Sequence, residues 1–130
     1  MTTLNPNATA HCSNILVFLG ESILESTSMG DREGLIWFNG KFVEWKDANI
    51  HILSHGLHYA SSVFEGERSY SGKIFKVREH TERLFDSAKA LDLKIPYSVD
   101  EIIEASRKAL ELNNLTNAYL RPIVWRGEEM

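Results

Sequence analysis

The sequence predicts an α+β domain, with a mostly antiparallel sheet and two helices packed on one of its faces. Short strand-like runs occur in pairs joined by tight turns, and two stretches with helical spacing of apolar residues precede a last strand-like run. Hairpins pair antiparallel, and two helices on one sheet face would bury both apolar stripes. We expect this domain to span residues 35–130. Residues 1–34 are rich in Thr, Ser, Asn and Gly, and we expect a poorly ordered extension there.

The first hairpin is predicted by "LIWFNGKFVEW". Asn39 and Gly40 both tolerate positive φ, which makes this pair a strong signal for a two-residue hairpin turn. The sequence therefore predicts a strand at 35–38, a tight turn and a strand at 41–45.

The next segment contains a second hairpin after an irregular stretch. The alternation in "DANIHIL" predicts a short strand around 50–53, and residues 54–66 are expected to be irregular, with one helical turn. The run "ERSY", at 67–70, and the run "IFKV", at 74–77, flank a turn formed by "SGK".

Two helices and a strand complete the domain. Apolar residues at helical spacing predict a helix at about 78–92. In "SVDE", Ser98 and Glu101 have the spacing of a capping box, which predicts a second helix at about 99–113. The run "NAYLRPIVW" predicts a last strand at 118–125.

Composition argues against several classes of function. Fourteen basic and eighteen acidic residues are interspersed and give a net charge of −4, so nucleic acid is not expected as a partner. The longest apolar run, Ile15 to Leu19, is too short to span a membrane, and no Lys or Arg precedes Arg32 to form a signal peptide. The single cysteine, Cys12, excludes an internal disulfide and is interpreted as inert. A cytoplasmic location is expected.

The histidines do not predict a metal site. His51, His55 and His58 are close in sequence, but no Asp or Glu lies between Asp47 and Glu65 to complete a ligand set. Structural roles are favoured for these histidines.

Arginines are the strongest candidates for binding an anion, because the planar guanidinium matches carboxylate and phosphate. Arg68, Arg78, Arg83 and Arg121 all lie in suitable contexts. The spacing of Glu79 and Arg83 nevertheless favours a surface ion pair between them, since such pairs are common on helices.

The aromatic residues between the hairpins have an ordinary interpretation. Tyr59, Phe64 and Tyr70 are predicted to lie in the core or at its rim, and Gly66 to mark a bend or a close backbone approach. No hydrolase elbow, phosphate-binding glycine loop or zinc motif is present.

The segment "SHGLHYASSVFEGERSYSGKIFKVREHTERL" closely resembles the branched-chain amino acid aminotransferases, which are class IV, fold-type IV enzymes that use pyridoxal 5′-phosphate. The resemblance runs from Leu35 to Met130 and corresponds to the small N-terminal domain of that family. It implies a chain truncated before the large domain. Because "MGDREGLIW" is similar to a family N-terminus, Met29 is a candidate start.

The resemblance assigns a role to one arginine in the H-x-x-R-L pattern, His80 to Leu84. It implies that Arg83 binds the cofactor phosphate, which replaces the interpretation as a surface ion pair. A doubly charged phosphate also compensates a guanidinium better than a surface carboxylate does.

The F-E-G-x-R pattern, from Phe64 to Arg68, implies a substrate pocket. By resemblance, Phe64 and Gly66 line its apolar wall, and Tyr59 lies at its edge, contributed across a dimer interface. Arg68 and Arg121 would lie at the polar end, where the second carboxylate of glutamate is held.

The implied reaction is reversible transfer of an amino group between leucine, isoleucine or valine and 2-oxoglutarate, in a homo-oligomer. The lysine that binds the cofactor covalently would lie beyond residue 130, so this chain alone is expected to be inactive. Two alternatives stay open: another class IV enzyme, related to D-amino acid aminotransferase or aminodeoxychorismate lyase, and a non-catalytic dimerisation or binding lobe. The F-E-G-x-R pattern disfavours the former.

Overall fold

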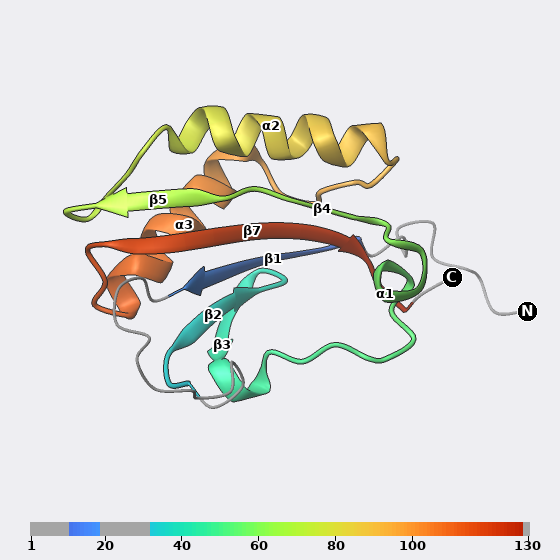
Figure 1. Ribbon diagram of the computed structural model, residues 1–130, viewed down its shortest axis with the longest axis horizontal. Helices are drawn as coiled ribbons and strands as arrows, with labels where there is room; N and C mark the ends of the chain where they lie inside the picture. Colours follow the sequence, from blue (N-terminus) through green and yellow to red (C-terminus); the bar gives the residue numbers. More distant parts are fainter. Residues whose placement is uncertain (1–10, 19–31, 129–130) are drawn as a thin grey trace, which may run out of the picture.

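A computed structural model describes residues 11–18 and 32–128 of the chain. It shows an α+β fold in which strands pair into a sheet and two long helices pack on it (Figure 1). The elements in chain order are β1 (His11–Phe18), β2 (Leu35–Phe38), β3 (Lys41–Glu44), the 3₁₀ turn η1 (Trp45–Asp47), α1 (His55–Tyr59), β4 (Ser62–Phe64), β5 (Glu67–Tyr70), β6 (Lys73–Ile74), α2 (Val77–Ala90), α3 (Val99–Leu112) and β7 (Ala118–Arg126).

The sheet is built around β7. Its order is β3-β2-β1-β7-β5-β6, and β4 also pairs with β7, on the same side as β5. Every pairing between the described strands is antiparallel, as the hairpin signals predict.

Strands β4 and β5 are one extended segment with a break in its ladder. Phe64 pairs with Ile123 and Glu67 with Leu120, so the register continues through the break. Opposite Glu65 lies Pro122, whose carbonyl accepts the Glu65 N–H at 2.9 Å. Proline has no N–H to donate in return, so one ladder hydrogen bond is missing at this point.

Both helices cover the same face of the sheet. Alternate residues of β7 point to that face, where Leu120 packs under α3 and Val124 under α2. The larger buried cluster consists of Trp37, Ile102, Ala105, Ala109, Leu110, Ala118 and Leu120. The smaller consists of Leu84, Ala88, Leu93 and Val124. The predicted layout, with two helices on one face, is therefore confirmed.

Most predicted elements are confirmed to within a residue or two. Asn39 and Gly40 form the first hairpin turn with φ of 50° and 91°, as that dipeptide predicts. The capping box is present, with the Glu101 N–H donating to Ser98 Oγ and the Ser98 N–H donating to Glu101. The single helical turn expected within 54–66 is α1.

Three predictions about strands are wrong. Of the run "IFKV", at 74–77, only Ile74 lies in a strand, because α2 already begins at Val77. Residues 50–53 form no strand; Ile50, Ile52 and Leu53 are exposed, because no neighbouring strand pairs with this stretch. Residues 11–18 were expected to belong to a poorly ordered extension, but they form β1, which pairs with β7 along its whole length. The rest of the predicted extension, 1–10 and 19–31, lies outside the described residues, and the boundary at 34 stays a prediction.

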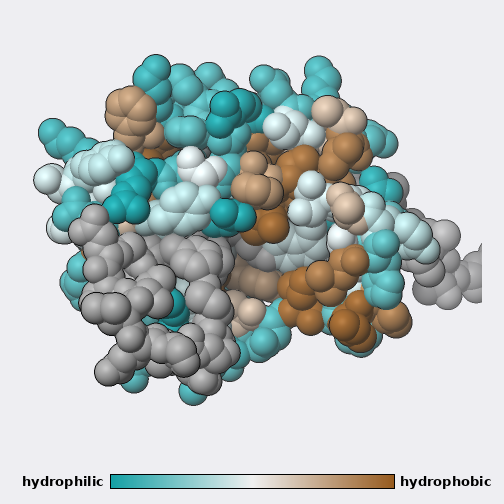
Figure 2. Space-filling model, in the orientation of Figure 1, coloured by the Kyte–Doolittle hydropathy of each residue, from teal (hydrophilic) through white to brown (hydrophobic). Residues whose placement is uncertain are grey.

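Apolar side chains also remain on the surface. Figure 2 shows them gathered near α1 and the segment that leads into it. In this part of the chain Ile50, Ile52, Leu53, Leu57 and Tyr59 are all exposed. Within the part of the chain that the structure describes, no helix is long and apolar enough to cross a membrane.

Candidate functional site

Side chains at the junction of β4 and β5 alternate between the two faces of the sheet. Glu65 and Glu67 are buried, with exposed fractions of 5% and 1%. Phe64 lies on the opposite face, as expected for neighbours in an extended chain. The junction therefore contributes to two distinct groups of side chains: a charged group beside α2 and an arginine-aromatic group on the face opposite α2 and α3.

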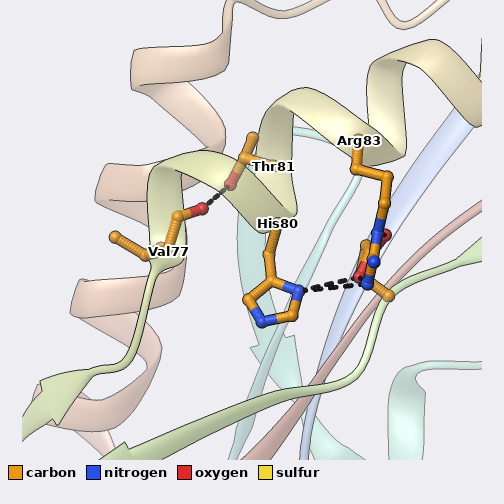
Figure 3. A network of polar contacts seen from close by, with 5 residues as sticks. Val77, His80, Thr81 and Arg83 are labelled. Atoms are coloured by element: carbon orange, nitrogen blue, oxygen red, sulfur yellow. Dashed lines mark hydrogen bonds and ion pairs between the residues drawn. The ribbon is translucent and has the colours of Figure 1, made fainter.

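The charged group joins Glu65 to two residues of α2. Arg83 donates through Nε to Glu65 Oε1 at 2.6 Å and through Nη2 to Oε2 at 2.7 Å. The His80 Nδ1 lies 2.9 Å from the same Oε2. His80 and Arg83 project from successive turns of α2 toward the same point (Figure 3), because residues three apart share a helix face. A single carboxylate thus ties the β4–β5 junction to the helix.

This arrangement settles the protonation of its members. The hydrogen bonds from Arg83, followed by those from His80, outweigh the effect of burial and lower the pKa of Glu65 below its ordinary value. Since the carboxylate is ionised, the proton in the His80 contact must be on Nδ1. The Glu65 hydrogen bonds raise the pKa of Arg83, which is charged at any pH of interest.

Arg83 is bound on one side only. Its side chain is 67% exposed, and among the described residues its hydrogen bonds use Nε and Nη2. Nη1 has no hydrogen-bond partner in that part of the chain. A guanidinium has five N–H donors, so its outer edge can still bind a second anion.

The arginine-aromatic group lies on the open face of the sheet. The Arg121 guanidinium stacks 4.2 Å from the centroid of the Phe64 ring and donates through Nη2 to the Tyr119 Oη at 2.7 Å. Arg121 Nε is buried and has no hydrogen-bond partner among the described residues. A Cβ on Gly66 would lie 2.7 Å from the Tyr119 Oη, so only glycine leaves room for this tyrosine.

Of the other predicted site residues, Arg68 lies on the same face as this group and Tyr59 lies on α1. Arg68 is opposite Tyr119 in the register, on the same face, and half-buried. Tyr59 is 73% exposed on α1, where its ring contacts His55 at a centroid distance of 4.4 Å. The structure thus brings Phe64, Gly66 and Arg121 together and keeps Tyr59 apart within this one chain.

Glu67 lies on the same face of the sheet as Glu65 but differs from it in hydrogen bonding and in pKa. Neither of its carboxyl oxygens has a hydrogen-bond partner among the described residues. Burial, together with the nearby charge of Glu65, raises its pKa to about 7. It is a buried carboxyl group that binds a proton close to neutral pH.

No metal site is formed by the described residues: no group of three or more His, Cys, Asp or Glu side chains comes together. His55 Nδ1 lies 2.5 Å from Ser61 Oγ, and His58 Nε2 lies 2.8 Å from the Ile52 carbonyl oxygen. These contacts tie α1 to its neighbours.

The structure adds three residues to the predicted site: Glu65, His80 and Tyr119. It also replaces the ion pair that helix spacing predicts, since the carboxylate bound to Arg83 is Glu65 rather than Glu79. A signal for His80 exists in the sequence, because it is three residues before Arg83. No local pattern predicts Glu65, which is 18 residues from Arg83.

Comparison with known proteins identifies the fold and its relatives. The family model described as amino-transferase class IV matches residues 62–130. A "Probable branched-chain-amino-acid aminotransferase" of Rickettsia felis is 57% identical over 94 residues, which are 72% of this chain and 32% of the relative. The branched-chain-amino-acid aminotransferase of Pseudomonas aeruginosa is 52% identical over 106 residues, covering 78% of this chain and 34% of the relative.

Solved structures agree with these relatives. The branched-chain amino acid aminotransferase of Escherichia coli superposes with a TM-score of 0.73 at 46% identity, covering 76% of this chain and 35% of that one. A branched-chain amino acid aminotransferase of T.th., complexed with N-(5′-phosphopyridoxyl)-L-glutamate, gives a TM-score of 0.73 at 41% identity, covering 76% and 35%. The chain spans about a third of the length of the curated relatives that it matches.

Proposed function

Because the chain belongs to the class IV aminotransferase family, we propose that it supplies the cofactor-phosphate site and the substrate side-chain pocket of a branched-chain amino acid aminotransferase. That enzyme transfers an amino group between leucine, isoleucine or valine and 2-oxoglutarate. The observation that carries the proposal is Arg83, which a buried carboxylate holds on one edge while the other edge faces outward.

The phosphate of pyridoxal 5′-phosphate fits Arg83. A phosphate dianion accepts several charge-assisted hydrogen bonds, and the outer guanidinium edge offers donors for them. The cofactor, when bound, supplies an electron sink for the substrate's Cα carbanion. The solved relative with a phosphopyridoxyl-glutamate ligand supports this choice of cofactor.

The open face fits a substrate that is apolar in one half-reaction and acidic in the other. Phe64, with Gly66 beside it, offers apolar surface for a branched side chain. Arg121 stacks on Phe64 and Arg68 lies on the same face, so a second carboxylate can bind beside the same wall. Tyr59 is too exposed to complete the pocket of its own chain, which supports a contribution to a second copy in a homo-oligomer.

The lysine that binds the cofactor covalently is proposed to lie outside these 130 residues. Such a lysine is typically desolvated or placed beside another cation, which lowers its pKa. All seven lysines of this chain are exposed: Lys41, Lys46, Lys73, Lys76, Lys89, Lys94 and Lys108. We therefore expect the chain by itself not to transaminate.

The test is to titrate the chain with pyridoxal 5′-phosphate and follow the phosphate by ³¹P NMR. Arg83→Met is expected to remove the saturable shift. Arg78→Met is the matched control, because Arg78 is on the same helix and pairs with Asp100 and Glu82 instead. An equal effect of both variants would contradict the assignment of Arg83.

Borohydride reduction followed by mass spectrometry tests the lysine. No stoichiometric adduct is expected with the wild-type chain. One adduct per chain on a single lysine would overturn the proposal that the covalent lysine lies elsewhere.

A non-catalytic binding lobe is the second candidate, favoured by the exposed apolar side chains around α1. It predicts a monodisperse particle that ignores pyridoxal 5′-phosphate. Sedimentation with and without the cofactor separates the two candidates. A sedimentation coefficient that changes when pyridoxal 5′-phosphate is added favours the aminotransferase.

A further inference from the structure

We propose that Glu65 and His80 are positioning residues, which orient the Arg83 guanidinium so that its outer edge is presented to the cofactor phosphate. This inference rests on the phosphate-binding role of Arg83 proposed above.

The geometry of the guanidinium supports this role first. The two bonds to Glu65, at 2.6 and 2.7 Å, are parallel and fix the plane of the group. They use Nε and one N–H of Nη2, so three donors remain for a second anion: the other N–H of Nη2 and both N–H groups of Nη1. A mostly exposed arginine side chain samples many rotamers when nothing holds it, and the ion pair removes much of that freedom before the phosphate binds.

Glu65 is itself held rigidly. Its side chain is 5% exposed, and its backbone N–H donates to the Pro122 carbonyl at 2.9 Å. His80 donates to Oε2, which prevents rotation of the carboxylate away from the plane of the guanidinium. The anchor of Arg83 is thus a carboxylate fixed by both its backbone and a second donor.

Arg78, which precedes Arg83 on α2, is held differently. Arg78 pairs with Asp100 and Glu82, whose side chains are exposed. A surface pair of this kind ties elements together without burying a charge. Burying the Glu65 carboxylate carries a desolvation cost, and such a pair is often no more stable than apolar packing. Orientation of Arg83 explains why a buried carboxylate is used here.

The experiment observes the Arg83 Nε–Hε resonance of the full chain by ¹⁵N–¹H NMR, with inorganic phosphate as the probe. In the wild type this resonance is expected to be resolved from those of exposed arginines and to shift on addition of phosphate. In Glu65→Gln it should move to the position of exposed arginines, and the apparent affinity for phosphate should fall by about tenfold. The Arg78 resonance is the internal control.

Glu67→Gln is the matched control variant, because Glu67 is equally buried two residues away and its carboxyl oxygens form no hydrogen bond with Arg83. It should leave the Arg83 resonance and the phosphate affinity unchanged. If Glu65→Gln and Glu67→Gln give the same Arg83 response, the positioning role is wrong and Glu65 serves stability alone.

His80 supplies a second, milder pair of variants that keeps the test available if Glu65→Gln does not fold. His80→Leu should weaken phosphate binding by about threefold, less than the roughly tenfold loss expected for Glu65→Gln. The loss is smaller because this variant removes one donor to the carboxylate and keeps both bonds from Arg83. His80→Asn, whose amide can donate in place of Nδ1, should restore phosphate binding. Equal affinities for both variants would count against the inference.

The two proposals can fail separately. A resolved Arg83 resonance that collapses in Glu65→Gln, but does not respond to phosphate in the wild type, would support positioning and contradict the phosphate role.

Discussion

Glu65 and Glu67 stand two residues apart on either side of Gly66, and both carboxyl groups are almost fully buried. Glu65 receives hydrogen bonds from Arg83 and His80, and its pKa is lowered. Glu67 has no hydrogen-bond partner among the described residues, and its pKa is raised to about 7. The comparison shows that burial alone does not decide the charge of a carboxyl group, because donors supplied by another element can reverse its effect.

This difference also distinguishes Glu65, which belongs to the candidate site, from Glu67, which does not contact Arg83 or His80 through a hydrogen bond. The donors to Glu65 come from α2, and one of them, Arg83, still has an outward-facing edge. Glu67 faces the same side of the sheet, but its carboxyl group forms no hydrogen bond with either donor. Variants of both residues, and of their neighbours, measure how differently the two carboxyl groups contribute to stability and to its pH dependence.

The largest effect is expected for Glu67→Gln as a function of pH. The folded-state pKa of Glu67, about 7, lies above its ordinary value of 4.5, so the folded chain binds this proton more tightly than the unfolded chain. Its contribution to stability is present below pH 4.5 and is lost as pH rises through 7. Between these limits the free energy of unfolding of the wild type should fall, relative to Glu67→Gln, by about 3 kcal/mol.

Denaturant unfolding of both proteins at several pH values measures that difference. A constant difference between pH 4 and 8 would show that Glu67 titrates normally.

A smaller effect is expected for Gly66→Ala, at the residue between the two carboxyl groups. The added Cβ would lie 2.7 Å from the Tyr119 Oη, so the tyrosine must move and its hydrogen bond to Arg121 must lengthen. We expect a loss of about 2 kcal/mol in the free energy of unfolding, typical of overpacking. In a Tyr119→Phe background the clash is relieved, so the loss measured there by thermal unfolding should be clearly smaller.

Glu65→Gln should show a pH dependence of the opposite sign to that of Glu67→Gln. Because the folded-state pKa of Glu65 is lowered, its contribution to stability is present above the ordinary carboxyl pKa and is lost as pH falls through the folded value. In denaturant unfolding, the variant should therefore be less stable than the wild type at neutral pH, with the gap closing in acid. A gap that widens in acid would exclude the ion pair as its cause.

The smallest effect is expected for Phe64→Ala, on the other face of the sheet. Phe64 is 54% exposed, and the Arg121 guanidinium stacks on its ring. The loss of stability should be about 0.5–1 kcal/mol, the range for an exposed cation–π contact. Chemical unfolding checks the value, and a loss well above that range, as large as for a core aromatic, would mean that Phe64 belongs to the core.

The parts of the fold that the sequence predicts correctly are those set by local interactions. The Asn39-Gly40 turn, the capping box at Ser98 and the helical spacing along α2 and α3 are each encoded within a few residues. The strand predicted at 50–53 failed because alternation cannot reveal whether a pairing partner exists. Strand β1 was missed for the complementary reason, since its partners β2 and β7 are distant in the sequence.

The candidate site shows the same limit. The positions of Phe64, Gly66 and Arg121 on one face follow from strand alternation and the pairing of β4 with β7. The carboxylate partner of Arg83 could not be predicted, because it depends on where α2 packs against β4. Helix spacing proposed Glu79, a local partner, where the structure uses a distant and buried one.

The most direct test of the difference between the two carboxyl groups is to titrate both by ¹³C NMR, in the wild type and in Arg83→Met. We expect the pKa of Glu65 to lie below 4.5 and that of Glu67 near 7 in the wild type. In Arg83→Met, the pKa of Glu65 should rise toward that of its neighbour. Two carboxyl groups with the same pKa in the wild type, or a Glu65 that ignores the loss of Arg83, would contradict the proposed ion pair and the orientation of Arg83 that depends on it.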